Sequence, residues 1–437
     1  MDAQILPRSA EANERLHALV PGGAHTYAKG DDQYPEGLAP VISHGRGAHV
    51  WDIDGNSYIE YGSGLRSVSL GHAHPRVVDA VRRELGRGTN FVRPCIVELA
   101  AAEKFLATVP TADMVKFAKN GSDVTTAAVR LARAATGRPV VAICADHPFF
   151  STDDWFIATT GMPAGIPDEI AGLTVRFPYG DLAATEDVLR QHDVACLILE
   201  AATAVEPPPG YLQGLRDLAD RYGTVLVFDE MITGFRWSEA GAQGYYGVAP
   251  DLSTFGKALG NGFAVSALAG KRELMELGGL RDTRERVFLL STTHGAETHS
   301  LAAAMAVMDT YAEEGIAARL HALGERLASG VRDVAAAMGV ADHVVVRGRA
   351  SNLVFGTLDS RFRPSQPYRT LFLRQLVAGG VLGPSFVVSS ALTEDDIDRT
   401  VDVVAQACAV YRKALDVEDP TPWIGGRPVK PVFRPHA

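Results

Sequence analysis

The sequence has no long apolar run, no closely paired cysteines and no excess of basic residues over its 437 positions. No stretch approaches the ~18 uninterrupted apolar residues of a membrane-spanning helix, and residues 1–16 are polar and mixed in charge, so we expect neither membrane insertion nor export. The 42 Lys and Arg residues against 52 Asp and Glu give a net charge of −10. Since a phosphate backbone selects for concentrated basic residues, we expect no nucleic-acid partner, and we expect a cytoplasmic protein.

Cysteine is also scarce. The four cysteines, Cys95, Cys144, Cys196 and Cys408, include no C-x-x-C pair. Reduced thiols in the core fit this arrangement better than a disulfide framework or a zinc site. Internal repeats and low-complexity tracts are missing as well, and an apolar fraction of 46% with a charged fraction of 22% is ordinary for a soluble globular protein.

Turn and periodicity signals divide the chain into three stretches. Residues 1–60 contain a short helical stretch and the hairpin-like AHVWDIDGNSYIEY, whose turn is at Asp54-Gly55-Asn56. Residues 319–437 have the pattern helix, strands and helix, followed by a tail rich in Pro and Gly that should be extended. We expect these two stretches to pack together as a smaller α+β domain.

Residues 61–318 have the alternating pattern of an α/β domain. Val140–Cys144, Val194–Glu200 and Thr224–Asp229 are short, nearly all-apolar runs, each preceded by a helix-like segment. Strands of this composition are buried on both faces, as in a parallel sheet that helices cover on both sides. The sequence therefore predicts a large α/β domain over residues 61–318.

Two segments of this domain carry ionisable residues suited to chemistry. In TVLVFDEMITGFR an apolar strand ends in Asp229 and Glu230, at the edge where open α/β sheets bind ligands; an acidic pair after a strand is equally typical of a solvated turn. In STFGKALGNG, Lys257 lies between an apolar approach and a Gly-rich exit. Partial desolvation would lower the pKa of such an amine, as imine formation requires, although Gly-flanked lysines are also common at surfaces.

A third segment, KFAKNGSDVTTAAVRLARAATG, predicts a strand, a small polar turn at Asn120, Gly121 and Ser122, and an Ala-rich helix. Free backbone N–H groups at a helix N-terminus form a site for phosphate, and glycine permits close approach. An ordinary N-cap has the same local pattern, so the segment alone does not decide between the two.

Together these segments resemble the class-III pyridoxal-phosphate-dependent aminotransferases, and among them the glutamate-1-semialdehyde aminomutase branch. The resemblance extends over nearly the whole chain, through VWDIDGNSYIEY, LGHAHP, LVFDEMITGFR, GVAPDLSTFGKALGNG and FVVSSALTEDDID. It implies a fold-type I transferase, with a large domain whose mixed, mostly parallel sheet is covered by helices and a smaller α+β domain from both termini. It also implies pyridoxal 5'-phosphate as cofactor and a homodimer with shared active sites.

The resemblance assigns roles to individual residues. Lys257 is similar to the Schiff-base lysine, which moves the Cα proton once substrate displaces it, and Asp229 to the carboxylate that keeps the pyridine nitrogen protonated. Thr293, in STTHGAET, resembles the threonine that reaches the phosphate of the neighbouring subunit. The phosphate-binding turn of the family is matched by Asn120, Gly121 and Ser122.

Three segments depart from the family pattern or carry no chemistry in it. Glu200 occupies the acidic position after the preceding strand, but Ala201 follows in place of the usual proline, so a solvated loop carboxylate stays an alternative. The family's Tyr-His-Gly is replaced by PFFS, which places the stacking aromatic at Phe149; a plain core aromatic is the alternative. His72 and His74 of LGHAHP match a stretch without metal, so we expect no metal site.

Two differences from the aminomutase branch indicate another substrate. GSGLRSVSLGHAHP carries Leu65 and Arg66 in the pocket region, where that branch has a tryptophan. Together with HTYAKGDDQYP, PFFSTDDWF and GGRPVKPVFR, the pattern resembles aminotransferases that act on sugar or aminocyclitol carbonyls, including those of aminoglycoside antibiotic biosynthesis. Four carboxylates would suit a polyhydroxylated substrate and would serve equally as caps of helices and loops. They are Asp31, Asp32, Asp153 and Asp154.

The expected reaction is a transamination. An amino-acid donor such as glutamate or glutamine gives its amino group to an aldehyde or ketone of a small polar acceptor. An aminomutase or epimerase would use the same residues but return the amino group to the same molecule. A third alternative, a member that binds without catalysis, is disfavoured by the joint presence of Lys257, Asp229 and the phosphate turn.

Overall fold

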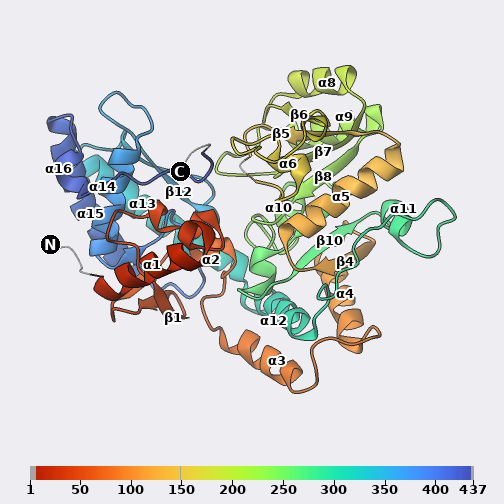
Figure 1. The fold of residues 1–437 in the computed structure, drawn as a ribbon, viewed down its shortest axis with the longest axis horizontal. Coiled ribbons are helices and arrows are strands. Elements are labelled where there is room, and N and C mark those ends of the chain that lie inside the picture. The colour runs from red at the N-terminus through yellow and green to blue at the C-terminus, as the bar shows by residue number, and fades with distance from the viewer. Residues whose placement is uncertain (1–5, 148, 435–437) are drawn as a thin grey trace. The chain divides into compact units, whose positions relative to one another are not determined.

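The computed structural model describes residues 6–147 and 149–434, which divide into two compact units (Figure 1). The larger unit consists of residues 65–68 and 75–317, and the other of residues 6–64, 69–74 and 318–434. Both units therefore combine segments that are separate in the sequence.

A seven-stranded sheet forms the centre of the larger unit. Its strands, in order across the sheet, are β4 (Met114–Ala118), β10 (Ser266–Gly270), β9 (Leu252–Phe255), β8 (Val225–Asp229), β7 (Val194–Leu199), β5 (Val140–Cys144) and β6 (Thr174–Phe177). Neighbours from β9 to β6 pair in parallel, whereas β10 runs antiparallel to both β9 and β4. The predicted mixed, mostly parallel sheet is confirmed, and two of the three predicted strands are each one residue shorter than expected.

Two apolar cores cover the opposite faces of this sheet. Along β5, Val141 and Ile143 belong to one core, while Ala142 and Cys144 belong to the other. The first core includes α5 (Gly121–Thr136), and the second includes α8 (Leu182–Gln191) and α9 (Tyr211–Tyr222) (Figure 1). The strands are nearly all apolar because each face of the sheet is covered by helices.

The remaining helices of the larger unit are shorter or lie beside the sheet. They are α3 (Pro75–Leu85), α4 (Ile96–Thr108), α6 (Asp154–Ile157), α7 (Asp168–Ala171), α10 (Gly241–Tyr246), η4 (Lys257–Gly260), α11 (Arg272–Met275), η5 (Glu276–Gly278) and α12 (Thr298–Glu314). The four-residue α2 (Ser63–Arg66) contributes its last two residues to this unit.

Strand direction determines which loops come together. Because β10 reverses direction between β9 and β4, the strand β4 runs the same way as β9. The strands β4, β5, β7, β8 and β9 therefore all end at one edge of the sheet, and the loops that follow them share this edge. In open α/β sheets this is the edge where ligands bind.

The second unit combines a four-stranded sheet, a two-stranded sheet and helices. The strands are β1 (Ile42–Arg46), β2 (His49–Asp52), β3 (Ser57–Glu60) and β13 (Val381–Leu382) in the first sheet, and β11 (Val344–Arg347) and β12 (Val354–Thr357) in the second. The helices are α1 (Pro7–Leu19), η1 (Pro21–Gly23), η2 (Tyr27–Lys29), η3 (Asp31–Gln33), α13 (Ile316–Ala337), η6 (Ala350–Asn352), α14 (Gln366–Ala378), α15 (Glu394–Asp416) and α16 (Thr421–Ile424). The predicted hairpin is confirmed by the pairing of Val50 with Tyr58, and Gly55 adopts φ 94° in its turn.

The tail departs from its prediction at one place. It was expected to be extended, yet residues 421–424 form α16, with Pro422 in its first turn and Gly425 at φ 68° after it. Proline pre-sets a helical φ and glycine permits the left-handed residue that ends a helix, so the same residue types that suggest extended chain also frame a single helical turn. Over residues 6–147 and 149–434, no helix combines the length and apolar character needed to cross a bilayer.

Candidate active site

The register of three parallel strands brings Glu200, Asp229 and Lys257 to one edge of the sheet. Leu199 in β7 lies opposite Phe228 in β8, so Glu200 and Asp229 are the next residues along neighbouring strands. Asp229 in turn lies opposite Thr254 in β9, three residues before Lys257. Because neighbouring strands are ~4.8 Å apart, groups at these positions interact directly.

Asp229 is held in place by two hydrogen bonds. Its side chain is 2% exposed, and Oδ1 accepts from the Met231 backbone N–H and from the Thr254 hydroxyl, both at 3.0 Å. Burial raises the pKa of this carboxyl above its ordinary value, while the Lys257 amine and the two hydrogen bonds oppose the shift. A carboxylate made more basic by burial is suited to holding a proton on a nearby nitrogen.

Lys257 has an amine with a lowered pKa and a backbone in the left-handed region. Burial lowers the pKa of its amine, against the opposing effect of the Asp229 and Glu200 carboxylates, so the neutral form needed to attack a carbonyl is favoured. Its φ of 44° is in the left-handed region, which a non-glycine residue adopts at a cost of about 1–3 kcal/mol and mostly at functional sites. A side chain at the preceding position would displace Met231, because a Cβ at Gly256 would lie 2.7 Å from Met231 Sδ.

The turn at Asn120 reaches the same place. Asn120 caps α5 in a capping box with Asp123, and its carbonyl accepts from the Ser266 hydroxyl at 2.8 Å. A Cβ at Gly121 would lie 3.1 Å from the same Met231 Sδ that crowds Gly256. One methionine side chain, two residues after Asp229, therefore contacts both the helix N-terminus and the residue before Lys257.

Glu200 and His147 form a buried pair that the sequence did not indicate. Burial and, to a smaller extent, the Asp229 carboxylate raise the pKa of Glu200 to about 8, against the opposing effect of Lys257 and Arg66. The Glu200 backbone N–H donates to His147 Nδ1 at 3.0 Å, and burial lowers the pKa of His147 to about 4. The ring is therefore neutral with its proton on Nε2, an atom that is buried and has no partner among the residues the structure describes. An orphaned buried donor at this edge fits a polar ligand.

The loop after β5 is bound to the first turns of α5. The Thr152 backbone N–H donates to Ser122 Oγ at 3.0 Å, and Thr125 Oγ1 donates to the Phe150 carbonyl at 2.8 Å. Phe150 is 2% exposed and belongs to the core, whereas Phe149 is 40% exposed and meets Phe156 edge-on at 5.5 Å between ring centroids. Of the two aromatics, Phe149 is the one whose ring remains accessible beside the helix N-terminus.

Leu65 and Arg66 lie in a turn with unusual backbone geometry. Ser63, Gly64, Leu65 and Arg66 have φ angles of 45°, 55°, 59° and 72°, which makes α2 a left-handed turn. Each non-glycine residue in this conformation costs roughly 1–2 kcal/mol. Burial lowers the pKa of the Arg66 guanidinium, which the Glu200 carboxylate partly offsets, and the Arg66 carbonyl accepts from Arg236 Nη2 at 3.0 Å. The turn thus brings a half-buried cation into the field of Glu200.

Arg236 is a second residue that sequence analysis missed. It is 1% exposed and follows Asp229 by seven positions, in ITGFR.

Glu230, the other half of the acidic pair, has a structural role: its carboxylate accepts from the backbone N–H groups of Ala242 and Gln243 at 2.8 Å each, at the start of α10. Of the acidic pair, only Asp229 is directed to the site edge.

The four carboxylates proposed for a polyhydroxylated substrate fall into two groups. Asp31 and Asp32 lie in the second unit, where each pairs with a basic side chain. Asp31 pairs with His17 at 3.0 Å and Asp32 with Arg434 at 2.5 Å. Asp153 and Asp154 lie in the larger unit at the start of α6 and are exposed. Contacts within the protein therefore account for Asp31 and Asp32 without a substrate.

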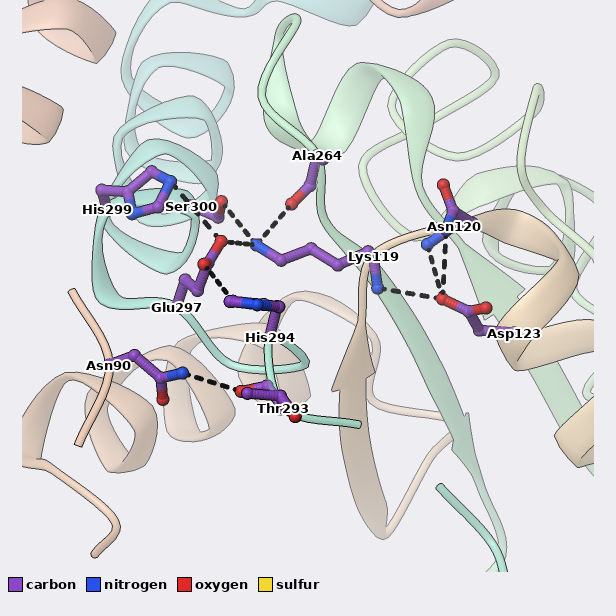
Figure 2. Close-up of polar contacts among 10 residues, drawn as sticks. All are labelled: Asn90, Lys119, Asn120, Asp123, Ala264, Thr293, His294, Glu297, His299 and Ser300. Carbon is purple, nitrogen blue, oxygen red and sulfur yellow. Dashed lines mark hydrogen bonds and ion pairs between the residues drawn. The ribbon is translucent and has the colours of Figure 1, made fainter. Parts of the chain in front are cut away.

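Thr293 lies in an exposed segment before α12 (Figure 2). Its carbonyl accepts from Asn90 Nδ2 at 2.9 Å, which fixes the backbone at this position.

His72 contacts Glu60 at 3.3 Å between Nε2 and Oε2, and within the described residues no three His, Cys, Asp or Glu side chains are grouped as a metal site would require. All four cysteines are free thiols.

A half-buried lysine and a buried aspartate lie at the carboxyl edge of a mostly parallel seven-stranded sheet, and a capped helix N-terminus contacts this edge through Met231. Together these features define a fold-type I pyridoxal-phosphate-dependent transferase. The family model for class-III aminotransferases matches residues 32–382. The chain belongs to the class-III aminotransferases, and its cofactor is pyridoxal 5'-phosphate.

Known proteins are similar over almost the full length. Glutamate-1-semialdehyde 2,1-aminomutase of Desulfitobacterium hafniense is 34% identical, over 90% of this chain and 96% of that protein. An omega-transaminase from Sphaerobacter thermophilus has 27% identity and a TM-score of 0.83, over 92% of this chain and 98% of that one. A transaminase solved with pyridoxal phosphate bound has 25% identity and a TM-score of 0.85, over 95% of this chain and all of that one.

Covalent attachment to Lys257 can be measured directly. Reduction with borohydride after loading should leave the cofactor on Lys257 in the wild type, identified by peptide mass, and nowhere in Lys257→Ala. Lys271→Ala is the matched control, because it removes a lysine of the same unit that pairs with Asp251 at 2.5 Å; it should keep the adduct. An adduct on another lysine, or none in the wild type, would contradict the assignment.

Glu200 should impose a pH dependence on the stability of the cofactor-free protein. Its pKa in the folded state is about 8, above its ordinary 4.5, so between these pH values the folded protein keeps a proton that the unfolded chain releases. Stability must then fall as pH rises through this window. We expect the melting temperature of Glu200→Gln, relative to wild type, to rise steadily from pH 5 to 8. Glu285→Gln, at an exposed position, should show no such trend, and parallel curves for Glu200→Gln and wild type would contradict the inference.

Proposed function

We propose that this aminotransferase transfers an amino group from an amino-acid donor such as glutamate or glutamine to an aldehyde or ketone of a small polar acceptor. The observation that carries the proposal is the register of β7, β8 and β9, which sets a half-buried amine beside two buried carboxylates. Residues of this chain supply each function that the reaction needs, and the cofactor, when bound, supplies an electron sink for the carbanion at the substrate Cα.

Lys257 and Asp229 have the central roles. Lys257 binds the cofactor covalently and, once displaced by the donor, takes the Cα proton with its amine, whose pKa burial has lowered. Asp229 holds a proton on the ring nitrogen. The backbone N–H groups of Gly121 and Ser122, in the first turn of α5, bind the phosphate together with the positive end of the helix dipole. Phe149 covers the ring with an accessible aromatic face.

Glu200 and Thr293 complete the cofactor site. Glu200, with a raised pKa, provides a carboxyl that can donate a hydrogen bond near neutral pH. Thr293 is exposed in its own chain, which is what a residue that serves a second subunit requires. We therefore propose a homodimer with shared sites, with Asn120 next to the phosphate of its own subunit.

The mass of the active species tests the dimer. Sedimentation should give twice the mass of one chain for the active protein, and Thr293→Val should weaken cofactor binding without changing that mass. An active species with the mass of a single chain would contradict shared sites.

Several residues favour a polyhydroxylated acceptor, a sugar or aminocyclitol such as those of aminoglycoside biosynthesis. Arg66 offers a half-buried cation for the donor carboxylate, and Leu65 precedes it in the same left-handed turn. Asp153 and Asp154 are exposed carboxylates that can accept from hydroxyl and ammonium groups. They follow Ser151, whose loop is bound to α5.

The second candidate is an aminomutase or epimerase. The similarity to glutamate-1-semialdehyde 2,1-aminomutase, at 34% identity over 90% of this chain, favours it. The same lysine and aspartate would serve both reactions, so the chemistry of the edge does not separate them. Leu65 and Arg66, which occupy positions where the aminomutase pattern has a tryptophan, favour the transaminase.

One incubation separates the two. Glutamate or glutamine added to the loaded wild type without any oxo-acid should release about one equivalent of oxo-acid per subunit and then stop, as a transaminase requires. Sustained conversion of a single aminated substrate with no added oxo-acid would instead establish an isomerase. A screen of sugar and aminocyclitol aldehydes, read by product mass, then identifies the acceptor.

Arg66→Met provides a control on the donor. If the guanidinium binds the donor carboxylate, the dissociation constant for glutamate should rise by about tenfold or more, as for a lost charge-assisted hydrogen bond, while the limiting rate of the half-reaction changes less. An equal affinity for glutamate in Arg66→Met would remove Arg66 from the donor site.

A further inference from the structure

Lys119 lies directly before the phosphate turn and uses all three of its N–H donors. Its Nζ is 2.6 Å from Glu297 Oε2, 3.0 Å from Ser300 Oγ and 3.2 Å from the Ala264 carbonyl (Figure 2). An ammonium group has three donors and no acceptor, so this one is saturated by residues of the chain. Lys119 is therefore not available as a direct ligand of the phosphate.

The carboxylate of Glu297 binds Lys119 and does not cap its own helix. Glu297 is the N-cap residue of α12, yet its side chain makes no capping hydrogen bond to its own helix. Its carboxylate instead binds Lys119 through Oε2 and His294 Nδ1 through Oε1, the latter at 2.7 Å (Figure 2). The hydrogen bond from Lys119 lowers the pKa of the Glu297 carboxyl, so the group is ionised.

Lys119 and its three partners belong to three segments of the proposed site, with Glu297 and Ser300 both at the start of α12. Asn120 follows Lys119, and both backbone N–H groups donate to Asp123 Oδ2, at 2.9 Å for Asn120 and 3.3 Å for Lys119. Ala264 follows the turn that contains Lys257. Glu297 ends the exposed segment that begins near Thr293. One ammonium group thus connects the phosphate turn, the chain after Lys257 and the Thr293 segment.

The pair is only partly exposed, with 17% of the Lys119 side chain and 19% of the Glu297 side chain accessible. Solvent therefore screens it less than a surface ion pair, which typically contributes little. Removing Lys119 would abolish all three contacts, whereas removing Glu297 would leave the ammonium group partly buried and bound only to Ser300 and Ala264.

We propose that Lys119 and Glu297 are positioning residues that hold the phosphate contacts of the cofactor in register: the N–H groups after Asn120 in the same subunit and Thr293 for its partner. The pair touches neither substrate nor reacting atoms. The inference rests on the proposed cofactor site, and it goes beyond that site because it assigns the phosphate affinity to a contact outside it.

The test compares two forms of the vitamin on the cofactor-free protein. Pyridoxal 5'-phosphate carries the phosphate and pyridoxal does not, so the ratio of their dissociation constants isolates the phosphate contacts. For Lys119→Met and for Glu297→Gln we expect the dissociation constant of pyridoxal 5'-phosphate to rise about tenfold, as for one lost charge-assisted contact, and that of pyridoxal to stay within about twofold. The double variant should be no weaker than either single one, because both changes break one interaction.

Two further variants serve as controls. Lys119→Arg keeps a cation opposite Glu297 and should keep the wild-type ratio. Lys104→Met breaks a matched pair with Asp309, which joins α4 to the middle of the same helix α12, and should change neither dissociation constant.

A merely structural role would weaken the binding of pyridoxal and of pyridoxal 5'-phosphate by the same factor. The ratio of the two dissociation constants would then keep its wild-type value, and that result would overturn the proposal. Should Lys119→Met not fold, Glu297→Gln decides alone, because it leaves the bonds of Lys119 to Ala264 and Ser300 in place. A wild type that fails to attach the cofactor at Lys257 would instead refute the proposed site, so the two failures are distinguishable.

Discussion

The desolvation of one amine beside two carboxylates is the interaction on which the rest of the site depends. Outside water, Lys257 favours its neutral form, while Asp229 and Glu200 favour protonation, so all three titrate away from their ordinary ranges. This arrangement is costly without a compensating ligand, and it persists because the sheet register fixes it. Parallel strands that end at one edge leave these side chains no other place.

Local patterns in the sequence were sufficient for three strands of the sheet, whereas the roles expected for Asp229 and Lys257 depended on the resemblance of several segments to one family. The apolar runs before Asp229 and Glu200 are strands because both faces of the sheet are covered, and such strands have a composition that is hard to mistake. The hairpin was equally clear, since Asp54-Gly55-Asn56 between two β-rich runs permits few other structures. Asn120 as the cap of an Ala-rich helix is likewise a property of a few adjacent residues.

The contacts that the sequence did not reveal join residues far apart in the chain or depend on backbone strain. His147 accepts from the Glu200 backbone, and Lys119 meets Glu297 across most of the larger unit's sequence. Nothing in DHPFF or in HGAET indicates these partners, because each pairing is created by the fold. The left-handed turn at residues 63–66 contains only one glycine, so its sequence does not indicate the conformation. Which of Phe149 and Phe150 stays accessible depends on which ring packs into the core.

That left-handed turn has an evolutionary consequence. Its conformation belongs to the backbone, so the Cα at position 66 keeps its place whichever side chain it carries, provided the rest of the fold bears the strain. A lineage could then exchange the side chain at position 66, which we propose binds the donor, without rebuilding the loop. Diversity of amino donors among enzymes with this turn would accumulate by single substitutions at its end, while the residues that carry the chemistry stay constant.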